Sequence, residues 1–335
     1  MESYKKTDLF GSFSFPATFF VFLRVEYQRI AYAKNCTNIV LKTKVTSMRI
    51  IDGKICAQIV KDRIANEVAE IKAKGQRPPR LDIFLVGDRP DSLTYVHNKD
   101  NTCRSLGMDS VLHLLPDTTT ESELMVMIDE CNRNEEVDAI LIQLPLPDHY
   151  NSARVLDFID YRKDADGLHL MNVGLLHLGE PYVIPCTPKG ILTLLATNNI
   201  EVAGEHVVMI GRSQLVGEPT AQLLIHNNAT VTLCHSRTKN LSEIAHIGDI
   251  VITAVGCPNL LQPYDFKKGA VLIDVAMNRV NGKLQGDVYS EETRPELEKR
   301  LRACTPVPGG VGPMTIAMLM QNVLDIYKLR MSGNK

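Results

Sequence analysis

Short apolar runs alternate with longer helix-like segments from residue 80 almost to the end of the chain. Each run is rich in Val, Ile and Leu, as the buried strands of a parallel sheet are. Parallel strands need a crossover connection, usually a helix, so this succession predicts an α/β fold. The expected strands are residues 80–87, 111–115, 139–144, 206–211, 230–234, 250–254 and 270–274. The expected helices are residues 55–74, a segment through Tyr95 to about 106, a segment from the 118–123 start to 134, 220–226 and 314–330.

A chain of 335 residues is long for one domain and suited to two. A second unit begins near Thr187, and its strand 206–211 opens the succession typical of a doubly wound nucleotide-binding sheet. We therefore expect an α/β unit followed by a doubly wound nucleotide-binding unit.

The balance of charges excludes several classes of partner. A net charge of −2 gives no electrostatic reason to bind nucleic acid or an anionic membrane. No apolar stretch reaches the roughly 20 residues that cross a bilayer. The eight cysteines form no C-x-x-C pair and the nine histidines no H-x-x-x-H pair, so we expect no metal site. Scattered cysteines are typical of reduced thiols in an intracellular protein.

The first 47 residues differ from the rest, because they are basic and hold most of the phenylalanines. Lysines, an apolar run and Ala31-Tyr32-Ala33 resemble a secretory signal, whereas the shortage of acids suits an organellar presequence. Alternatively the segment precedes the true start at Met48, where regular patterning begins. We favour this last interpretation, which predicts a cytoplasmic enzyme; a genuine presequence would make it mitochondrial.

A glycine turn follows the strand that ends at Gly211. Gly211 permits a tight turn, Gly217 a close backbone approach, and Pro219 suits an early helical position. Free N–H groups at such a helix start favour a phosphate, and Arg212 could add a charge-assisted fork. The next strand ends at 234–237 (Cys-His-Ser-Arg), where an acid would favour NAD and these residues favour NADP. The alternative is a plain turn with a surface arginine.

Four side chains form the candidate catalytic group: Tyr95, Lys99, Gln143 and Asp166. Tyr95 and Lys99 are four apart and share a helix face, and Gln143 and Asp166 follow the next strand. A lysine has an ordinary pKa of about 10.4, which burial pulls toward neutral, so that it can act as a base beside an amide. Taken singly, such residues are more often a surface Tyr–Lys pair, an Asp-Gly turn and a strand cap, so the interpretation depends on all four together.

Longer motifs strengthen this interpretation. From about Met48 to Arg330 the chain resembles the methylenetetrahydrofolate dehydrogenase/cyclohydrolase family. The blocks that carry the resemblance are 92–99 (SLTYVHNK), 143–147 (QLPLP), 163–167 (KDADG), 185–190 (PCTPKG), 211–213 (GRS) with 216–217, 286–288 (GDV) and 305–315 (TPVPGGVGPMT).

The resemblance implies a homodimer that oxidises 5,10-methylenetetrahydrofolate with NADP and hydrolyses the product to 10-formyltetrahydrofolate. It implies a discontinuous α/β catalytic domain of residues 48–190 and 313–332 and a doubly wound, Rossmann-type NADP-binding domain at 191–312, with a folate cleft between them. Residues 1–47 would lie outside the fold. Lys99 would be the acid/base, tuned by Gln143, while Tyr95 stacks on the folate and Asp166 holds the pterin. The further substrate-binding residues implied are Ser92, Leu144, Pro145, Pro308, Gly309 and Gly310. The cofactor-binding residues implied are Gly211, Arg212, Ser213, Val216, Gly217, His235, Ser236, Ala254, Val255, Gly256 and Thr315.

Two positions depart from the family's usual residues. Ala165 stands where the family usually has Val, which is a mild change. Ala276-Met277-Asn278 stands where it usually has Gly-Ile-Asn, and the added methyl group near the nicotinamide would alter the fit of the cofactor. Relatives that use NAD carry an insertion before the second strand of the cofactor domain, and residues 227–229 leave no room for one, which favours NADP. The rival hypotheses are an unrelated two-domain dehydrogenase and a catalytically dead dimerisation partner; the presence of Lys99 and Asp166 speaks against the latter.

Overall fold

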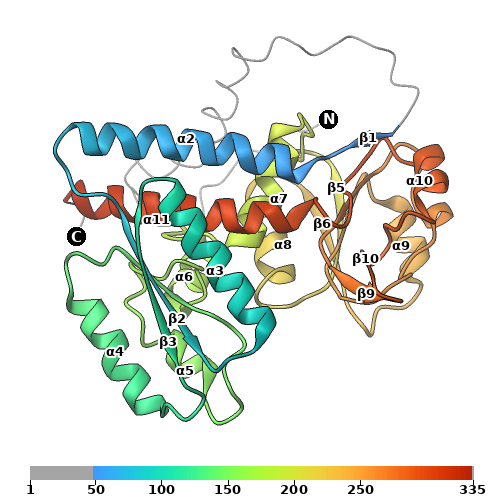
Figure 1. Cartoon of the computed structure of the whole chain (residues 1–335). Coiled ribbons are helices and arrows are strands. Elements are labelled where there is room, and N and C mark those ends of the chain that lie inside the picture. The colour runs from blue at the N-terminus through green and yellow to red at the C-terminus, as the bar shows by residue number, and fades with distance from the viewer. Residues whose placement is uncertain (1–47, 334–335) are drawn as a thin grey trace, which may run out of the picture. The chain divides into compact units, whose positions relative to one another are not determined.

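The computed structural model describes residues 48–333, and the expectations about residues 1–47 lie outside this range (Figure 1). The described chain forms two parallel sheets, of three and six strands, with a small two-stranded ribbon beside them. The expected α/β class with parallel strands is therefore confirmed.

The first sheet has the order β3-β2-β4, and all its pairs are parallel. A single bridge between Ile140 and Asp164 adds the 160s segment beside β4. Side chains of β2 alternate, so that Ile83 faces one hydrophobic core and Phe84 the other. The elements of this part are β2 (Arg80–Val86), α3 (Pro90–Ser105), β3 (Asp109–Leu115), α4 (Glu121–Arg133) and β4 (Ala139–Ile142).

Local signals in the sequence account for the ends of several helices. Asp52 caps α2 (Gly53–Ala73) by accepting from the N–H groups of Lys54 and Ile55. Gly75 follows in the left-handed region at φ 74° and ends the helix. Thr120 and Glu123 form a reciprocal capping box at the start of α4. These ends agree with the sequence expectations to within about two residues.

The second sheet has the order β1-β11-β8-β7-β5-β6, again with parallel pairs only. The chain moves from β5 to β6 on one side and then returns to β7 on the other, so the order reverses at β5. Ligands bind at such a switch point in doubly wound sheets. Its elements are β1 (Arg49–Ile50), β5 (His206–Ile210), α8 (Gly217–His226), β6 (Thr230–Cys234), α9 (Leu241–Ile247), β7 (Ile250–Thr253), β8 (Val271–Asp274), α10 (Arg294–Arg300) and β11 (Ala303–Cys304).

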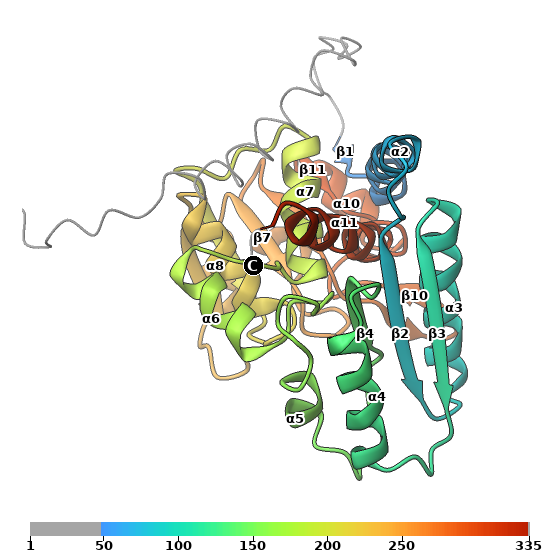
Figure 2. The same cartoon turned by 90° about the vertical axis from the view of Figure 1, so that its left-hand side faces the viewer.

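Three helices join the two sheets through one continuous hydrophobic core. The last helix, α11 (Val311–Met331), packs between α2 and α7 (Cys186–Thr197), and Figures 1 and 2 show α2 and α11 running side by side. Buried residues of all three helices belong to one cluster with Ile83 of β2 and Met209 of β5. Because this cluster includes residues of both sheets, burial of apolar surface holds the two sheets together.

The remaining elements are short. They are α5 (Ser152–Leu156), α6 (Leu170–Leu178), the 3₁₀ turn η2 (Pro263–Asp265) and the ribbon β9 (Asn278–Val280) with β10 (Lys283–Gln285). Among residues 48–333, no helix combines the length and the apolar character needed to cross a membrane.

Candidate active site

Lys99 and Gln143 are brought together at the carboxyl end of the first sheet. Lys99 lies halfway along α3, and its Nζ donates a hydrogen bond of 2.9 Å to Oε1 of Gln143, the residue that follows β4. The Nε2 group of Gln143 donates to the carbonyl of Leu144 at 2.7 Å, just before the cis bond to Pro145. Because a carbonyl can only accept, this contact orients the amide and directs its oxygen to the lysine.

Tyr95 and Ser92, the other predicted site residues of α3, differ in their exposure. Tyr95 lies one turn before Lys99 and is 47% exposed, so its ring is accessible to a ligand. Ser92 is buried near the start of the helix, whereas Lys99 itself is half-buried. A half-buried amine bonded to a side chain from another element is not the freely solvated surface lysine of the alternative interpretation.

Asp166 is oriented by the thiol of Cys186. The Sγ of Cys186 donates to Oδ1 of Asp166 at 3.2 Å. Burial and the neighbouring carboxylate raise the pKa of Cys186 well above its usual value, and the charges of Lys99 and Lys189 oppose this rise. The thiol therefore stays protonated and acts as a donor that orients the Asp166 carboxylate.

Asn322 of α11 holds the loop that carries Asp166, a role that the sequence did not reveal. Its Nδ2 donates to the carbonyls of Ala165 and Ile184, both at 2.9 Å, and its Oδ1 accepts from Lys189 at 3.0 Å. Asn322 is 2% exposed, so these bonds replace the water that a buried amide requires.

The turn after β5 is built from two glycines that approach the backbone. Gly211 has φ 120°, and a side chain there would meet the carbonyl oxygen of Ala254 at 2.5 Å. At Gly217, the first residue of α8, an added Cβ would lie 2.1 Å from the carbonyl oxygen of Gly211. The turn therefore lies against the end of β7, at the reversal of strand order.

The residues predicted to bind the cofactor's phosphates lie on the surface in and near this turn. Arg212, Ser213 and Ser236 are exposed, and within residues 48–333 Arg212 forms no ion pair. The hydroxyl of Ser213 accepts weakly from the N–H groups of Val216 and Gly217, at 3.3 and 3.4 Å. This arrangement fits a dinucleotide, because a glycine turn at a helix start lets a phosphate approach the backbone, and a guanidinium without an ion pair among the described residues favours a phosphate.

Asp287 positions the loop that faces the glycine turn, and the sequence assigned it no role. Its carboxylate accepts from the N–H groups of Val255, Gly256 and Cys257 at 2.9, 3.3 and 2.7 Å. It also accepts from Nδ2 of Asn278 at 3.1 Å. Val255 and Gly256 are exposed and Ala254 is half-buried. The buried Asp287 therefore fixes the shape of an exposed loop through hydrogen bonds to its backbone.

The amino-terminal parts of α7 and α11 contact each other close to Cys186. Thr315 hydrogen-bonds Thr187 at 3.1 Å between hydroxyls, and Thr187 is the neighbour of Cys186. The glycine-rich loop before α11 contacts the start of α2, where the N–H of Gly53 donates to the carbonyl of Gly309 at 2.9 Å. The predicted substrate residues Pro308, Gly309 and Gly310 thus lie where α2 and α11 meet.

The predicted cofactor residue His235 follows β6 and is half-buried. Its backbone N–H donates to the hydroxyl of Thr238 at 2.8 Å.

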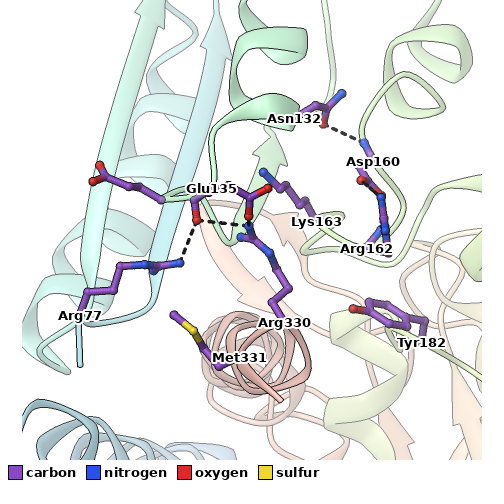
Figure 3. Close-up of a pocket in the computed structure, with 10 residues that line it drawn as sticks. Arg77, Asn132, Glu135, Asp160, Arg162, Lys163, Tyr182, Arg330 and Met331 are labelled. Carbon is purple, nitrogen blue, oxygen red and sulfur yellow. Dashed lines mark hydrogen bonds and ion pairs between the residues drawn. The ribbon is translucent and has the colours of Figure 1, made fainter. Parts of the chain in front are cut away.

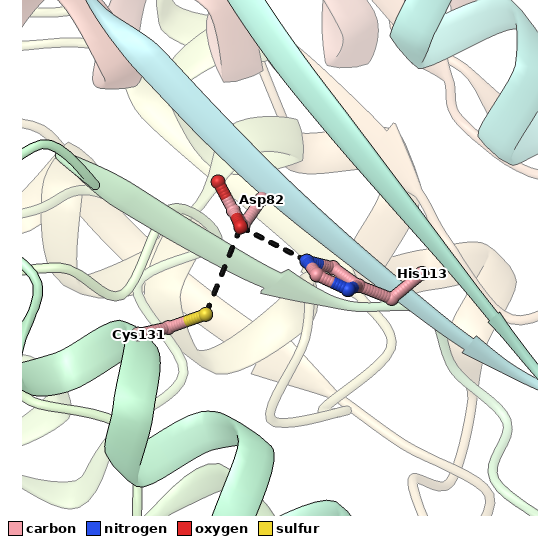
Figure 4. Close-up of side chains that lie close together, drawn as sticks. All are labelled: Asp82, His113 and Cys131. Carbon is pink, nitrogen blue, oxygen red and sulfur yellow. Dashed lines mark hydrogen bonds and ion pairs between the residues drawn. The ribbon is translucent and has the colours of Figure 1, made fainter.

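One further cluster contains ligand types that metals use: Asp82, His113 and Cys131 (Figure 4). His113 contacts Asp82 at 2.9 Å and Cys131 donates to it at 3.7 Å. However, Arg80 donates to both carboxylate oxygens, at 2.8 and 3.1 Å. Burial and Asp82 raise the pKa of the Cys131 thiol to about 12. The carboxylate is therefore already neutralised and the thiol protonated, so the cluster is an ion-pair network of the core.

A doubly wound sheet with a glycine turn at its switch point, joined to a second α/β unit with a lysine–amide–carboxylate site, defines a dinucleotide-dependent enzyme. Models of tetrahydrofolate dehydrogenase/cyclohydrolase domains match the chain: the catalytic domain over residues 51–166 and the NAD(P)-binding domain over residues 185–331. The chain belongs to the tetrahydrofolate dehydrogenase/cyclohydrolase family, as the sequence motifs predicted.

Relatives of known annotation and structure agree with this assignment. The bifunctional protein FolD of Halalkalibacterium halodurans is 46% identical over 279 residues, covering 83% of this chain and 98% of the relative. A crystal structure of FolD from Campylobacter jejuni is 41% identical with a TM-score of 0.81, covering 84% and 99% of the two chains. The Trypanosoma brucei enzyme in complex with NADP and an inhibitor is 36% identical with a TM-score of 0.79, covering 85% and 99%.

Proposed function

We propose that this protein is a bifunctional enzyme that oxidises 5,10-methylenetetrahydrofolate with NADP and hydrolyses the resulting 5,10-methenyltetrahydrofolate to 10-formyltetrahydrofolate. The observation that carries the proposal is the hydrogen bond from Lys99 to Gln143, beside an Asp166 oriented by Cys186. Relatives named as bifunctional methylenetetrahydrofolate dehydrogenase/cyclohydrolases support it.

Lys99 is the acid/base of the hydrolytic step. Water must lose a proton as it attacks the cationic methenyl carbon, and a proton must reach the ring nitrogen as the ring opens. A lysine in a fixed position can perform both transfers. Gln143 holds the amine through a neutral carbonyl, so the pair adds no negative charge to compete for the proton.

Asp166 and Tyr95 bind the folate. A carboxylate can accept two hydrogen bonds from an amino group and an adjacent ring N–H, which the pterin presents together. The exposed Tyr95 ring provides a flat apolar face for stacking. We place Ser92, Leu144, Pro145 and the 308–310 loop around the same ligand.

Bound NADP supplies the hydride acceptor. Gly211 and Gly217 let the backbone approach its phosphates, and Arg212 with Ser236 would hold the 2′-phosphate. The chain passes from α8 to β6 in three residues, 227–229, which leaves no insertion there. Both features favour NADP over NAD, and most of the rate of hydride transfer would come from holding donor and acceptor in the correct geometry.

We also propose the domain limits given above, with one difference in the structure: β1 pairs with β11, so residues 49–50 belong to the second sheet.

A homodimer is supported by the edge strand β6, which carries an exposed Leu233. Sedimentation at several concentrations tests this. A cytoplasmic location is supported by the bacterial relatives.

The test of the whole proposal is an assay of NADP reduction with methylenetetrahydrofolate, followed by detection of 10-formyltetrahydrofolate. It should be run with NADP and with NAD, on chains starting at Met1 and at Met48. Both products are expected with NADP. An enzyme that reduces NADP with an amino or hydroxy acid but ignores folate would be an unrelated dehydrogenase.

A further inference from the structure

A buried lysine of α7 lies behind the loop that carries Asp166. Lys189 follows Cys186 by three residues, so the two side chains share one face of α7, and both are buried. Lys189 is 9% exposed, which is rare for a lysine unless its charge is paired. The function proposed above gives this residue no role.

Lys189 is bonded to two residues of α11. Its Nζ donates to Oδ2 of Asp325 at 2.8 Å and to Oδ1 of Asn322 at 3.0 Å. The side chains of Lys189 and Asp325 are 10% and 23% exposed, so the ion pair is largely shielded from water. Shielding strengthens the attraction between the two charges, and the amine is therefore held at a fixed position against α11.

The bond from Lys189 determines the orientation of the Asn322 amide. An amide accepts through its oxygen and donates through its nitrogen. Because Oδ1 is bonded to the ammonium group, Nδ2 points to the carbonyls of Ala165 and Ile184, both at 2.9 Å. Nδ2 also donates to Sγ of Cys186 at 3.5 Å. In the reverse orientation the amide oxygen would face two carbonyl oxygens and the amide nitrogen would face a cation.

These bonds join the two segments that meet at Asp166. Ala165 is the chain neighbour of Asp166, and Ile184 precedes Cys186 by two residues. The thiol of Cys186 donates to the Asp166 carboxylate at 3.2 Å. Asn322 therefore fixes both segments from behind, and the position of the Asp166 carboxylate depends on an amide that is itself held by a lysine.

We propose that Lys189 is a positioning residue for the folate: through Asn322 it places Asp166 for binding the pterin. This role rests on the proposed function, which assigns Asp166 to the pterin. The bond between Lys99 and Gln143 joins α3 to the end of β4, and the glycine turn belongs to the second sheet. Lys189 should therefore influence folate binding more than the chemical steps or the cofactor.

The carboxyl end of α11 and the start of the Asp166 loop have anchors of their own. In the last turn of α11, Arg330 bonds both Glu135 and the buried Asp138 at 2.9 Å. Lys163, three residues before Asp166, donates to two carbonyls at the end of α4, at 2.9 and 2.8 Å. Figure 3 shows Arg330 and Lys163 in one polar pocket. Loss of the lysine on α7 should thus loosen the Asp166 loop without detaching α11.

The test compares steady-state kinetics of the unmodified chain and Lys189→Met, with methylenetetrahydrofolate as the varied substrate and NADP at saturation. We expect the KM for the folate to rise about fivefold or more, with kcat within about twofold, because only binding is lost. The KM for NADP, measured at saturating folate, should not change. A merely structural role would lower the fraction of active protein, and so kcat, without raising the KM for the folate.

A double variant separates positioning from stability. Lys189→Met leaves the shielded carboxylate of Asp325 without this cation, which destabilises the fold. Lys189→Met/Asp325→Asn removes both charges, so it should be more resistant to urea than the single variant. It does not restore the bond to Asn322, so the KM for the folate should stay raised. If the folded double variant has the folate KM of the unmodified chain, the proposal is wrong.

The matched control is Lys328→Met. Lys328 is another lysine of this helix group, and it pairs with Glu67 across α11 and α2. Its loss should leave kcat and both KM values unchanged. An unmodified chain that does not turn over methylenetetrahydrofolate would contradict the proposed function itself. An active chain whose Lys189 variants keep the folate KM, or raise the NADP KM equally, would contradict only the role of Lys189.

Discussion

The carboxylate of Asp274 accepts the backbone N–H of Asp287 at 3.0 Å, and the carboxylate of Asp287 in turn accepts three N–H groups of the loop after β7. Two buried acids in series thus shape the surface that faces the glycine turn. Neither contacts solvent, so both act by positioning the backbone.

Replacement of Asp287 should therefore affect the cofactor more than the folate. In Asp287→Asn one carboxylate oxygen becomes an N–H₂ group that faces N–H donors, with a loss of about 1.5–3 kcal/mol for each charged hydrogen bond removed. We expect the KM for NADP to rise about tenfold or more, while hydrolysis of supplied methenyltetrahydrofolate changes little. An equal loss of both activities would indicate general damage to the fold.

Lys99→Met should abolish hydrolysis and spare part of the hydride transfer. Removal of a general acid/base typically costs about 10²- to 10⁴-fold in rate. The two activities are measured separately, by loss of methenyltetrahydrofolate absorbance and by NADPH formation. Lys267→Met, which removes a half-exposed lysine from a surface ion pair, is the control. Hydrolysis at the unmodified rate in Lys99→Met would show that another group handles the proton.

Gly217→Ala should prevent cofactor binding. The new methyl carbon would lie 2.1 Å from the carbonyl oxygen of Gly211, so the turn must open. We expect NADP affinity measured by fluorescence quenching to fall by at least tenfold. Gly174→Ala is the matched control, because it adds the same methyl group in α6 with no atom within 4 Å. An alanine at 217 that leaves affinity intact would exclude close backbone approach as the reason for this glycine.

Asp274 should make the protein less stable as pH rises through the mildly acidic range. Burial, opposed by three backbone N–H groups, raises its pKa to about 6, above its ordinary value of 3.8. Between these values the folded state binds more protons than the unfolded one, so this group's contribution to stability falls as pH rises from about 4 to 6. The expected change is about 3 kcal/mol in total.

Urea unfolding at pH 4 to pH 7 checks this expectation against Asp274→Asn. The difference in unfolding free energy between the two proteins should shrink as pH rises. The variant itself is destabilised at every pH, because its amide faces the N–H groups that the carboxylate accepts. A difference that does not depend on pH would mean that Asp274 ionises at its ordinary pKa.

The sequence predicted most elements because their causes are local. The capping box of Thr120 and Glu123 and the left-handed Gly75 act within a few residues, so they are visible in a single segment. Two ends of predicted elements differ from the structure. β4 ends at Ile142, which leaves Gln143 free to meet Lys99, and α8 begins at Gly217 rather than near Thr220.

The supporting residues of the site could not be predicted in the same way. Asn322 bonds the carbonyls of Ala165 and Ile184, which are more than a hundred positions away in the chain. Backbone carbonyls and N–H groups are the same in nearly every residue, so the sequence contains no pattern that indicates which side chain bonds to them. β1 was missed for a related reason: its two residues are too few for a period to be read.

The position of α11 has a consequence for synthesis of the protein. Among the elements of residues 48–333 this helix is synthesised after all the others, yet it fills the core shared by α2, β2 and α7. The amino-terminal unit must therefore wait, with its apolar surface open, until α11 has been synthesised. A chain truncated before α11 would lack the helix that closes that core, and we expect it to be a substrate for chaperones and proteases rather than a partly active enzyme.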